Sequence, residues 1–353
     1  MPDSIRDPDK IKKAKEIELY LKQEKKRFEQ LKKEPKVLIL GSSDSGKSTL
    51  LKQLKIIYSD GFTIEEKKHS KQLILSNLLT LCTTLLDIHK SGFEKLEEFT
   101  HGLVSGREGS FLVDTIPENV VELMVMMWND SKSQKFLTGL QPPVPDSTTH
   151  FINRLPELAK LECIPTQEDI LLLRTVTQTV SETIFNINMN NQIMRLHVFD
   201  VSGLMHHRKH WISYFDDVVS VLFIVSLSCY DQFMVEDHTI NRMHDSLKLF
   251  EDIVNHPLFK ETNMMIFLNK KDLYEKKLPN IPIKNYFPDY EGKPLSKTEG
   301  LQYFKQKFMA LDKSGKKRIS YHATCCTDTK LMSNIVANVM ISIQERLLNE
   351  ISR

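Results

Sequence analysis

A short apolar run, VLIL at residues 37–40, leads directly into GSSDSGKSTLLKQLKII at residues 41–57. The second stretch contains the pattern G-x-x-x-x-G-K-[ST] and continues with apolar residues at helical spacing. A strand, a glycine-bounded loop and a helix in this order are typical of a phosphate-binding loop, whose backbone N–H groups surround a phosphate chain. In such a loop Lys47 reaches the β- and γ-phosphates, and the Ser48 hydroxyl binds Mg²⁺. A glycine-rich turn without a ligand is the alternative, and the flanking strand and helix disfavour it.

Strand-like apolar runs return in the second half of the chain, after Arg174. They are residues 183–189, 193–199, 218–227, 264–268 and 319–324. Helical patterns at residues 240–253 and 300–310 fall between the later runs, and a long amphipathic helix is expected over residues 331–347. Alternating strands and helices predict a mostly parallel sheet covered on both faces.

The block between residues 62 and 168 has a different character, because helical periodicity dominates it. A long helix is expected to begin near Ile64, with further helices around residues 120–128 and 151–161. Residues 92–109 and 141–145 contain glycine and proline and are expected to be loops. This block is predicted to be a separate all-helical insert.

Residues 9–34 are predicted to form one long charged helix with a narrow apolar seam. The helix is too polar to bury much of its own surface. It is either a solvated surface helix, a docking helix for another protein or, less favoured, a membrane-surface helix.

Composition excludes several classes of protein. Of 353 residues, 41% are hydrophobic and 27% are charged, which fits two globular domains, and the net charge of +2 gives no general reason to bind nucleic acid. Five cysteines without C-x-x-C spacing fit reduced thiols better than disulfides or a zinc site. No apolar run is long enough to span a bilayer and the N-terminus has no secretory signal, so a soluble intracellular protein is expected.

A second motif, Asn269-Lys270-Lys271-Asp272, follows the apolar run at residues 264–268. N-K-x-D at a strand end suits guanine, because the Asp272 carboxylate can accept hydrogen bonds from both N1–H and the 2-amino group. Asn269 can contact the N7/O6 edge, and the stem of Lys270 can cover the base. The alternative is a solvated turn.

Two weaker motifs fit the same ligand. Asp200-Val-Ser-Gly203 ends another strand, where the aspartate can hold Mg²⁺ through water and the Gly203 N–H can meet a γ-phosphate. Residues 324–329, TCCTDT, follow the last strand and can bring the Cys326 N–H onto guanine O6. A helix cap by Asp328 or Thr329 is compatible with that role.

These four motifs in this order, together with the insert before Arg174, resemble the alpha subunits of heterotrimeric G proteins over essentially the whole chain. The resemblance implies an α/β fold: a Ras-like P-loop GTPase domain with a mostly parallel sheet, an inserted all-helical domain and a long N-terminal helix. The expected ranges are 1–34 for the helix that docks on the beta–gamma dimer, 35–61 and 172–353 for the GTPase domain, and 62–171 for the insert. GTP or GDP with Mg²⁺ would lie between the two domains.

Residue roles follow from the same resemblance. Arg174 would be the built-in arginine finger, Thr177 the second side-chain ligand of Mg²⁺ beside Ser48, and Asp44 the partner of Arg174 across the closed cleft. Without the family, Arg174 alone would be taken for a surface charge. The implied nucleotide-binding set is Ser43, Asp44, Ser45, Gly46, Lys47, Ser48, Thr49, Leu173, Arg174, Thr177, Asp200, Gly203, Asn269, Lys270, Asp272 and Cys326.

The chain departs from the family pattern at positions that affect hydrolysis. Leu204 stands where the family's catalytic glutamine orients the attacking water, and an alkyl group forms no hydrogen bond. Ser43 replaces a glycine close to the γ-phosphate, and Thr179 and Ser202 replace glycines of the two switches. Because loss of one positioned polar group costs about 10²–10³ in rate, slow intrinsic GTP hydrolysis is expected unless compensating residues or a partner restore it.

The ends of the chain also differ from the family. Pro2 and Asp3 argue against N-myristoylation, and no cysteine precedes Cys82 for N-terminal palmitoylation. A cytoplasmic protein is expected, reaching the inner face of the plasma membrane only through partners or the basic helix. The polar C-terminal end differs from the apolar tails that enter the seven-helix receptor. Ile184 and Trp211 match positions that face the beta–gamma dimer, or are ordinary packing residues.

The leading interpretation is a GTPase that acts as a signalling switch, cycling between a beta–gamma-bound GDP form and an effector-bound GTP form. The alternative is a GTP- or GDP-locked interaction protein that acts as a scaffold without turnover, which Leu204 and Ser43 favour. An ATPase or kinase is a more remote alternative.

Overall fold

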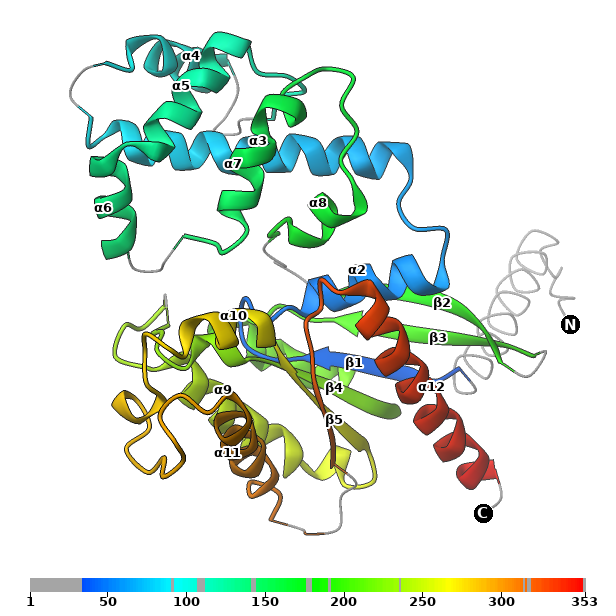
Figure 1. The fold of residues 1–353 in the computed structure, drawn as a ribbon. Coiled ribbons are helices and arrows are strands. Elements are labelled where there is room, and N and C mark those ends of the chain that lie inside the picture. Colours follow the sequence, from blue (N-terminus) through cyan, green and yellow to red (C-terminus); the bar gives the residue numbers. More distant parts are fainter. Residues whose placement is uncertain are drawn as a thin grey trace, which may run out of the picture.

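The computed structural model describes residues 34–89, 92–106, 112–140, 144–175, 180–189, 192–234, 236–313, 315 and 319–351. The long helix expected over residues 9–34 lies outside the described residues, apart from its last position. Figure 1 shows two parts, a sheet flanked by helices and a group of helices beside it.

Six strands form one sheet in the order β2-β3-β1-β4-β5-β6. They are β1 (Lys36–Leu40), β2 (Ser181–Met189), β3 (Gln192–Asp200), β4 (Val218–Ser226), β5 (Asn263–Asn269) and β6 (Ile319–Ala323). Only β2 pairs antiparallel, with β3, and the other four pairings are parallel. The predicted mostly parallel sheet and its strands are therefore confirmed.

Helices cover both faces of this sheet (Figure 1). They are α2 (Lys47–Tyr58), α9 (Arg242–Val254), α10 (Lys271–Lys277), α11 (Lys297–Met309) and α12 (Thr329–Ile351). Val37 and Ile39 of β1 pack with α2 and α12, whereas Leu38 and Leu40 pack with α9 and α11. Since both faces are covered, β4 is buried at every position, and its sequence is accordingly apolar except for Ser220 and Ser226.

The helical insert has its own hydrophobic core. Its helices are α3 (Ile64–Leu86), α4 (Glu94–Gly106), α5 (Glu118–Asn129), α6 (Ser131–Gly139), α7 (Thr148–Leu158) and α8 (Gln167–Leu172). Short 3₁₀ helices lie in the sheet domain at Met205–Tyr214, Leu227–Cys229, Pro257–Phe259 and Ile283–Asn285. No helix among the described residues is long and apolar enough to cross a membrane.

The prediction of a loop at residues 92–109 is wrong, because α4 occupies most of this range. Leu96 is fully buried, and Phe93, Phe99 and Leu103 pack around the same core at helical spacing. A glycine inside a helix costs about 1 kcal/mol relative to alanine, and burial of this apolar face outweighs the cost at Gly102.

Candidate functional site

The phosphate-binding loop joins β1 to α2 at the carboxyl edge of the parallel strands. Gly46 has φ +106°, and a Cβ there would lie 2.2 Å from the Asn269 side-chain nitrogen, so only glycine fits. Asp44 adopts the left-handed conformation with φ +57°. The Ser45 hydroxyl is buried and has no hydrogen-bond partner among the described residues, and Ser45 lines the pocket described below. A ligand in the cavity can accept a hydrogen bond from this Ser45 hydroxyl.

Lys47 is buried beneath the loop, where its Nζ donates to the carbonyls of Gly41 (3.0 Å) and Ser42 (2.8 Å). Burial lowers the pKa of Lys47 to about 8, and the Asp200 carboxylate opposes that shift. The ammonium is thus held against the loop backbone, and Lys47 also lines the cavity described below, where a phosphate-binding lysine is expected.

Ser48 and Asp200 meet although 152 residues separate them in the chain. Asp200 ends β3, which pairs directly with β1, and its Oδ2 accepts a 2.8 Å hydrogen bond from the Ser48 hydroxyl. A hydroxyl and a carboxylate are hard oxygen donors of the kind Mg²⁺ prefers, so these two residues fit the expected metal. Thr177, the other expected ligand, lies outside the described residues.

Asn269, at the end of β5, connects the phosphate loop to the segment after β6. Its Nδ2 donates to the Ser45 carbonyl (2.9 Å), and its Oδ1 accepts from the Cys326 N–H (2.9 Å) and the Thr324 hydroxyl (3.2 Å). The three motifs predicted to meet therefore do meet. Because the Cys326 N–H is already bonded to Asn269, its contact with guanine O6 would need a shared or switched hydrogen bond, and that contact stays a prediction.

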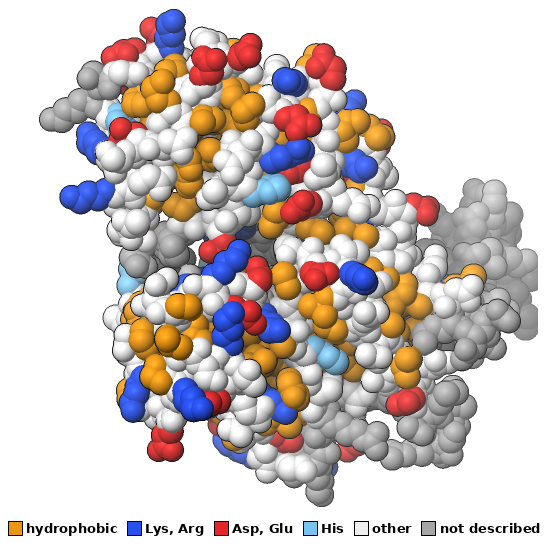
Figure 2. Space-filling model, in the orientation of Figure 1, with side chains coloured by type: hydrophobic (Ala, Val, Ile, Leu, Met, Phe, Trp, Pro, Cys, Tyr) orange, Lys and Arg blue, Asp and Glu red, His pale blue; other side chains and the backbone are white. Residues whose placement is uncertain are grey.

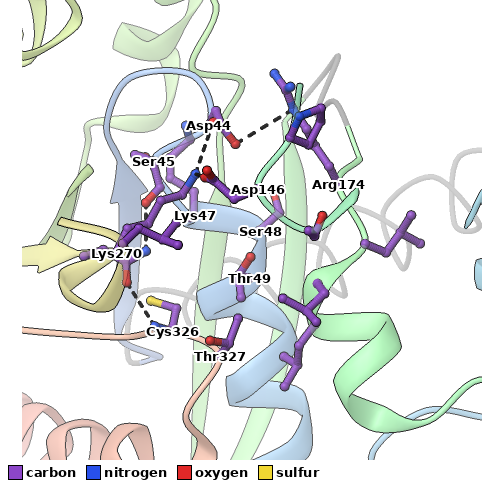
Figure 3. Close-up of a pocket in the computed structure, with 18 of the residues that line it drawn as sticks. Asp44, Ser45, Lys47, Ser48, Thr49, Asp146, Arg174, Lys270, Cys326 and Thr327 are labelled. Atoms are coloured by element: carbon purple, nitrogen blue, oxygen red, sulfur yellow. Dashed lines mark hydrogen bonds and ion pairs between the residues drawn. The ribbon is translucent and has the colours of Figure 1, made fainter. Parts of the chain in front are cut away.

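A cluster of charges surrounds Asp44 at the cleft between the two parts of the molecule (Figure 3). Lys270 lies 3.1 Å, Arg242 3.7 Å and Arg174 3.8 Å from its carboxylate oxygens. Burial would raise the pKa of Asp44, but the three cations outweigh it and lower that pKa below its usual value. The expected Asp44–Arg174 pair is present, and Asp146 of the insert lies 4.0 Å from Lys270. In Figure 2, acidic and basic side chains mingle along this boundary.

The segment after β3 presses against the phosphate loop. A Cβ at Gly203 would lie 2.4 Å from Lys47 Nζ and 2.7 Å from Ser43 N, so this close approach requires glycine. Arg208 holds the segment, because its guanidinium contacts the Gly203 carbonyl (3.3 and 3.4 Å) and both carboxylate oxygens of Asp245 (2.7 and 2.8 Å).

The two positions expected to face a partner differ in exposure. Trp211 is 2% exposed and donates to the Ser202 carbonyl (3.0 Å), so it is a packing residue in this structure. Ile184 on β2 is 43% exposed and remains available to a partner.

One cavity of about 330 Å³ contains most of the predicted site, which is a volume typical of small-molecule sites. The predicted residues that line it are Ser43, Asp44, Ser45, Gly46, Lys47, Ser48, Thr49, Leu173, Arg174, Gly203, Leu204, Asn269, Lys270, Asp272 and Cys326. Asp200 does not line it, but supports Ser48 from beneath.

Sequence reasoning missed further residues that line the cavity, chiefly from α2 and the insert: Lys52, Asp146, Ser147, His150, Lys276 and Thr327. Lys52 lies one turn after Ser48 on α2, and its Nζ donates to the carbonyls of Ile170 (2.9 Å) and Leu173 (2.8 Å). Its place one helical turn beyond Ser48 is the one sequence signal that could have found it. His150 contacts the buried Asp169 (2.8 Å) inside the insert, and no motif marks it.

Comparison with known proteins gives one consistent result. The family model described as G-protein alpha subunit matches residues 11–343. A guanine nucleotide-binding protein subunit alpha of Emericella nidulans is 35% identical over 338 residues, which is 94% of each chain. The guanine nucleotide-binding protein alpha-3 subunit of Caenorhabditis elegans is 35% identical over 86% of this chain and 87% of its own. The alpha-1 subunit of Neurospora crassa is 34% identical over 94% of each chain. The relatives match nearly the whole length of the chain, and the structure joins the phosphate loop to the segment after β6 through Asn269. The chain belongs to the G-protein alpha subunit family.

Proposed function

We propose that this chain is a guanine nucleotide-dependent signalling switch, the alpha subunit of a heterotrimeric G protein that binds GDP and GTP with Mg²⁺. The observation that carries the proposal is the hydrogen-bonded junction of Ser45, Asn269 and Cys326. This junction brings a phosphate-binding loop and an N-K-x-D motif to one cavity. The proposal keeps the expected division into an N-terminal helix (1–34), a GTPase domain (35–61 and 172–353) and a helical insert (62–171).

Each part of the nucleotide has candidate partners. Lys47 and the amides of residues 43–49 would bind the phosphates, and Asp272 with Asn269 would select guanine. Ser48 and Thr177 would hold Mg²⁺ directly, and Asp200 would hold it through water. When bound, Mg²⁺ neutralises charge on the β- and γ-phosphate oxygens.

Hydrolysis is proposed to be slow. Arg174 is within reach of the cleft and would stabilise charge that develops on the phosphates, but Leu204 lines the same cavity and cannot orient a water molecule. Ser43 adds a side chain at the point where Gly203 comes closest to the loop. Turnover therefore depends on Arg174 without the help of a polar residue at 204.

Partners and location follow from the family. A beta–gamma dimer would cover the exposed face around Ile184, a seven-helix receptor would contact the C-terminal helix, and an effector would read the segment after Gly203. The chain would be cytoplasmic and reach the inner face of the plasma membrane through these partners.

The proposal is tested by equilibrium titration of the purified chain with fluorescent mant-GDP in the presence of Mg²⁺. Unlabelled GDP and GTP are expected to compete equally or nearly so, and ATP is not expected to compete at the same concentration. Absence of binding, or equal competition by ATP, would refute it.

The alternative is a GTP- or GDP-locked scaffold without turnover, which the apolar Leu204 at the cavity favours. Chromatography of the nucleotide released from the purified protein separates the two functions when it is combined with single-turnover assays. Release of GTP alone, with no phosphate formed over hours, would establish the locked form. Release of GDP after loading with GTP would establish turnover.

A further inference from the structure

Two residues of the phosphate loop form hydrogen bonds with α9, the helix on the sheet face opposite α2 (Figure 1). Ser42 is only 1% exposed, and its hydroxyl oxygen lies 2.9 Å from the hydroxyl oxygen of Ser246 on α9, which is fully buried. The next loop residue, Ser43, has its carbonyl 2.7 Å from Nη2 of Arg242, at the first position of α9. Neither α9 residue lines the cavity, so both act on it through the loop.

The direction of the hydroxyl pair follows from proton counting. The Ser246 hydroxyl lies 2.9 Å from the Arg242 carbonyl, which can only accept a hydrogen bond, so Ser246 donates its single proton there. Ser42 must then donate to Ser246. The result is a buried relay from the phosphate loop, through Ser246, to the backbone of α9.

Arg242 is itself held in place. Its Nη1 donates to the Gln232 side chain (2.7 Å), its backbone N–H donates to the Gln232 carbonyl (2.9 Å), and its side chain is 12% exposed. Asn241 caps α9 by accepting from the N–H groups of Met243 (2.9 Å) and His244 (3.2 Å), and it donates to the Tyr230 carbonyl (2.8 Å). The first turn of α9 is therefore a firm support for the loop.

Peptide geometry converts these contacts into an effect on the cavity. In a trans peptide the carbonyl of one residue points opposite to the N–H of the next. Holding the Ser43 carbonyl on Arg242 therefore turns the Asp44 N–H away from α9 and toward the cavity. Asp44 has φ +57°, a conformation that costs about 1 kcal/mol for a residue other than glycine, so the loop needs such a restraint to keep this orientation.

We propose that Ser42, Ser246 and Arg242 are positioning residues that keep the phosphate-loop amides aimed at the bound nucleotide and so slow its release. This inference rests on the proposed guanine nucleotide binding. It assigns to the first two turns of α9 a role in nucleotide retention, in addition to the contact that Asp245 of the same helix makes with Arg208.

The test measures dissociation of mant-GDP from the full chain after addition of excess GDP. Ser42→Ala and Ser246→Ala should each speed dissociation about three- to tenfold, as expected for loss of one buried hydrogen bond. The double variant should be no faster than the faster single one, because both changes break the same relay. Arg242→Lys keeps the positive charge near Asp44 but loses the paired hydrogen bonds, and it should dissociate faster still.

Ser228→Ala is the matched control. Ser228 forms a second buried hydroxyl pair with Ser226, at 3.1 Å, and it does not line the cavity. This variant should lower the melting temperature about as much as Ser42→Ala, with dissociation unchanged. A Ser42→Ala rate within twofold of wild type, or an equal acceleration by Ser228→Ala, would overturn the inference. Failure of wild type to bind mant-GDP would refute the proposed function as well, whereas normal wild-type binding with unchanged variants would refute only the role of α9.

Discussion

Replacement of Asn269 by alanine tests the junction that carries the proposed function. The side chain makes three hydrogen bonds that join the Ser45 carbonyl, the Thr324 hydroxyl and the Cys326 N–H. Alanine leaves the carbonyl and the N–H without their partner in a buried region. Each unpaired group costs about 1–3 kcal/mol, which gives about 2–6 kcal/mol for the two.

Water that enters the space left by the shorter side chain will recover part of this cost, so we expect the lower half of the range, about 2–4 kcal/mol. The phosphate loop and the segment after β6 must lie together for the nucleotide to bind. The free energy lost with the Asn269 side chain should therefore appear as weaker nucleotide binding. At 1.4 kcal/mol for each factor of ten, mant-GDP affinity should fall about 30- to 700-fold.

The assay is a fluorescence titration with mant-GDP and Mg²⁺, with the melting temperature measured in parallel. Asn255→Ala is the control, because Asn255 also makes three hydrogen bonds, to Glu251, Leu311 and Lys313, but it is exposed and does not line the cavity. An Asn269→Ala protein that binds mant-GDP within threefold of wild type would refute the reasoning, whatever happens to its melting temperature.

Three further predictions follow. Asp272→Asn removes a charged acceptor for two guanine N–H groups and should lower GDP affinity at least about tenfold in a competition assay, and unchanged affinity would contradict guanine selection by this residue. Leu204→Gln should raise single-turnover GTP hydrolysis about 10²-fold or more, and Leu204→Met should stay far below it; equal rates for wild type and Leu204→Gln would contradict the expected slow turnover. Burial lowers the pKa of Lys52 to about 8 from 10.5, so between these pH values the unfolded chain binds more protons and the free energy of unfolding should rise with pH. Chemical denaturation at several pH values should show a smaller rise of the free energy of unfolding with pH in Lys52→Met than in wild type. Equal dependence on pH in the two proteins would contradict this prediction.

The sheet and its phosphate loop could be predicted from sequence because local and tertiary preferences agree there. VLIL at residues 37–40 is apolar on both faces, as a central parallel strand must be, and Gly46 stands where no side chain fits. Asn269 and Cys326 were predicted at one site because each follows a strand of the same parallel sheet, and such strand ends share an edge.

The prediction failed where tertiary packing outweighs local signals. Gly102 and the neighbouring glycines suggested a loop, yet Leu96 and Leu103 anchor α4 to the core of the insert. The helices α6 and α8 are short, and only their caps mark them: Asp130 accepts from the N–H groups of residues 132 and 133, and Thr166 forms a capping box with Asp169.

Apart from the Asp44–Arg174 pair, which the family resemblance implied, side-chain contacts across the cleft could not be predicted from sequence, for a different reason. The spacing from Ser48 can place Lys52 near the site, but nothing in the sequence pattern fixes how the insert sits on the sheet domain. The contacts of Lys52 with the end of α8 and of Lys270 with Asp146 therefore could not be predicted. Trp211 could not be assigned from sequence because an apolar side chain suits either a partner surface or the core, and its burial in the sheet domain decides for the core.

The residues that line the cavity are far apart in the sequence, from residue 43 to residue 327, and the insert contributes some of them. A ribosome must therefore release nearly the whole polypeptide before the complete pocket can form. A nucleotide that binds only the finished protein stabilises it by mass action, by about 4 kcal/mol at a thousand times its dissociation constant. We therefore expect added nucleotide to raise the resistance of the finished protein to unfolding and proteolysis.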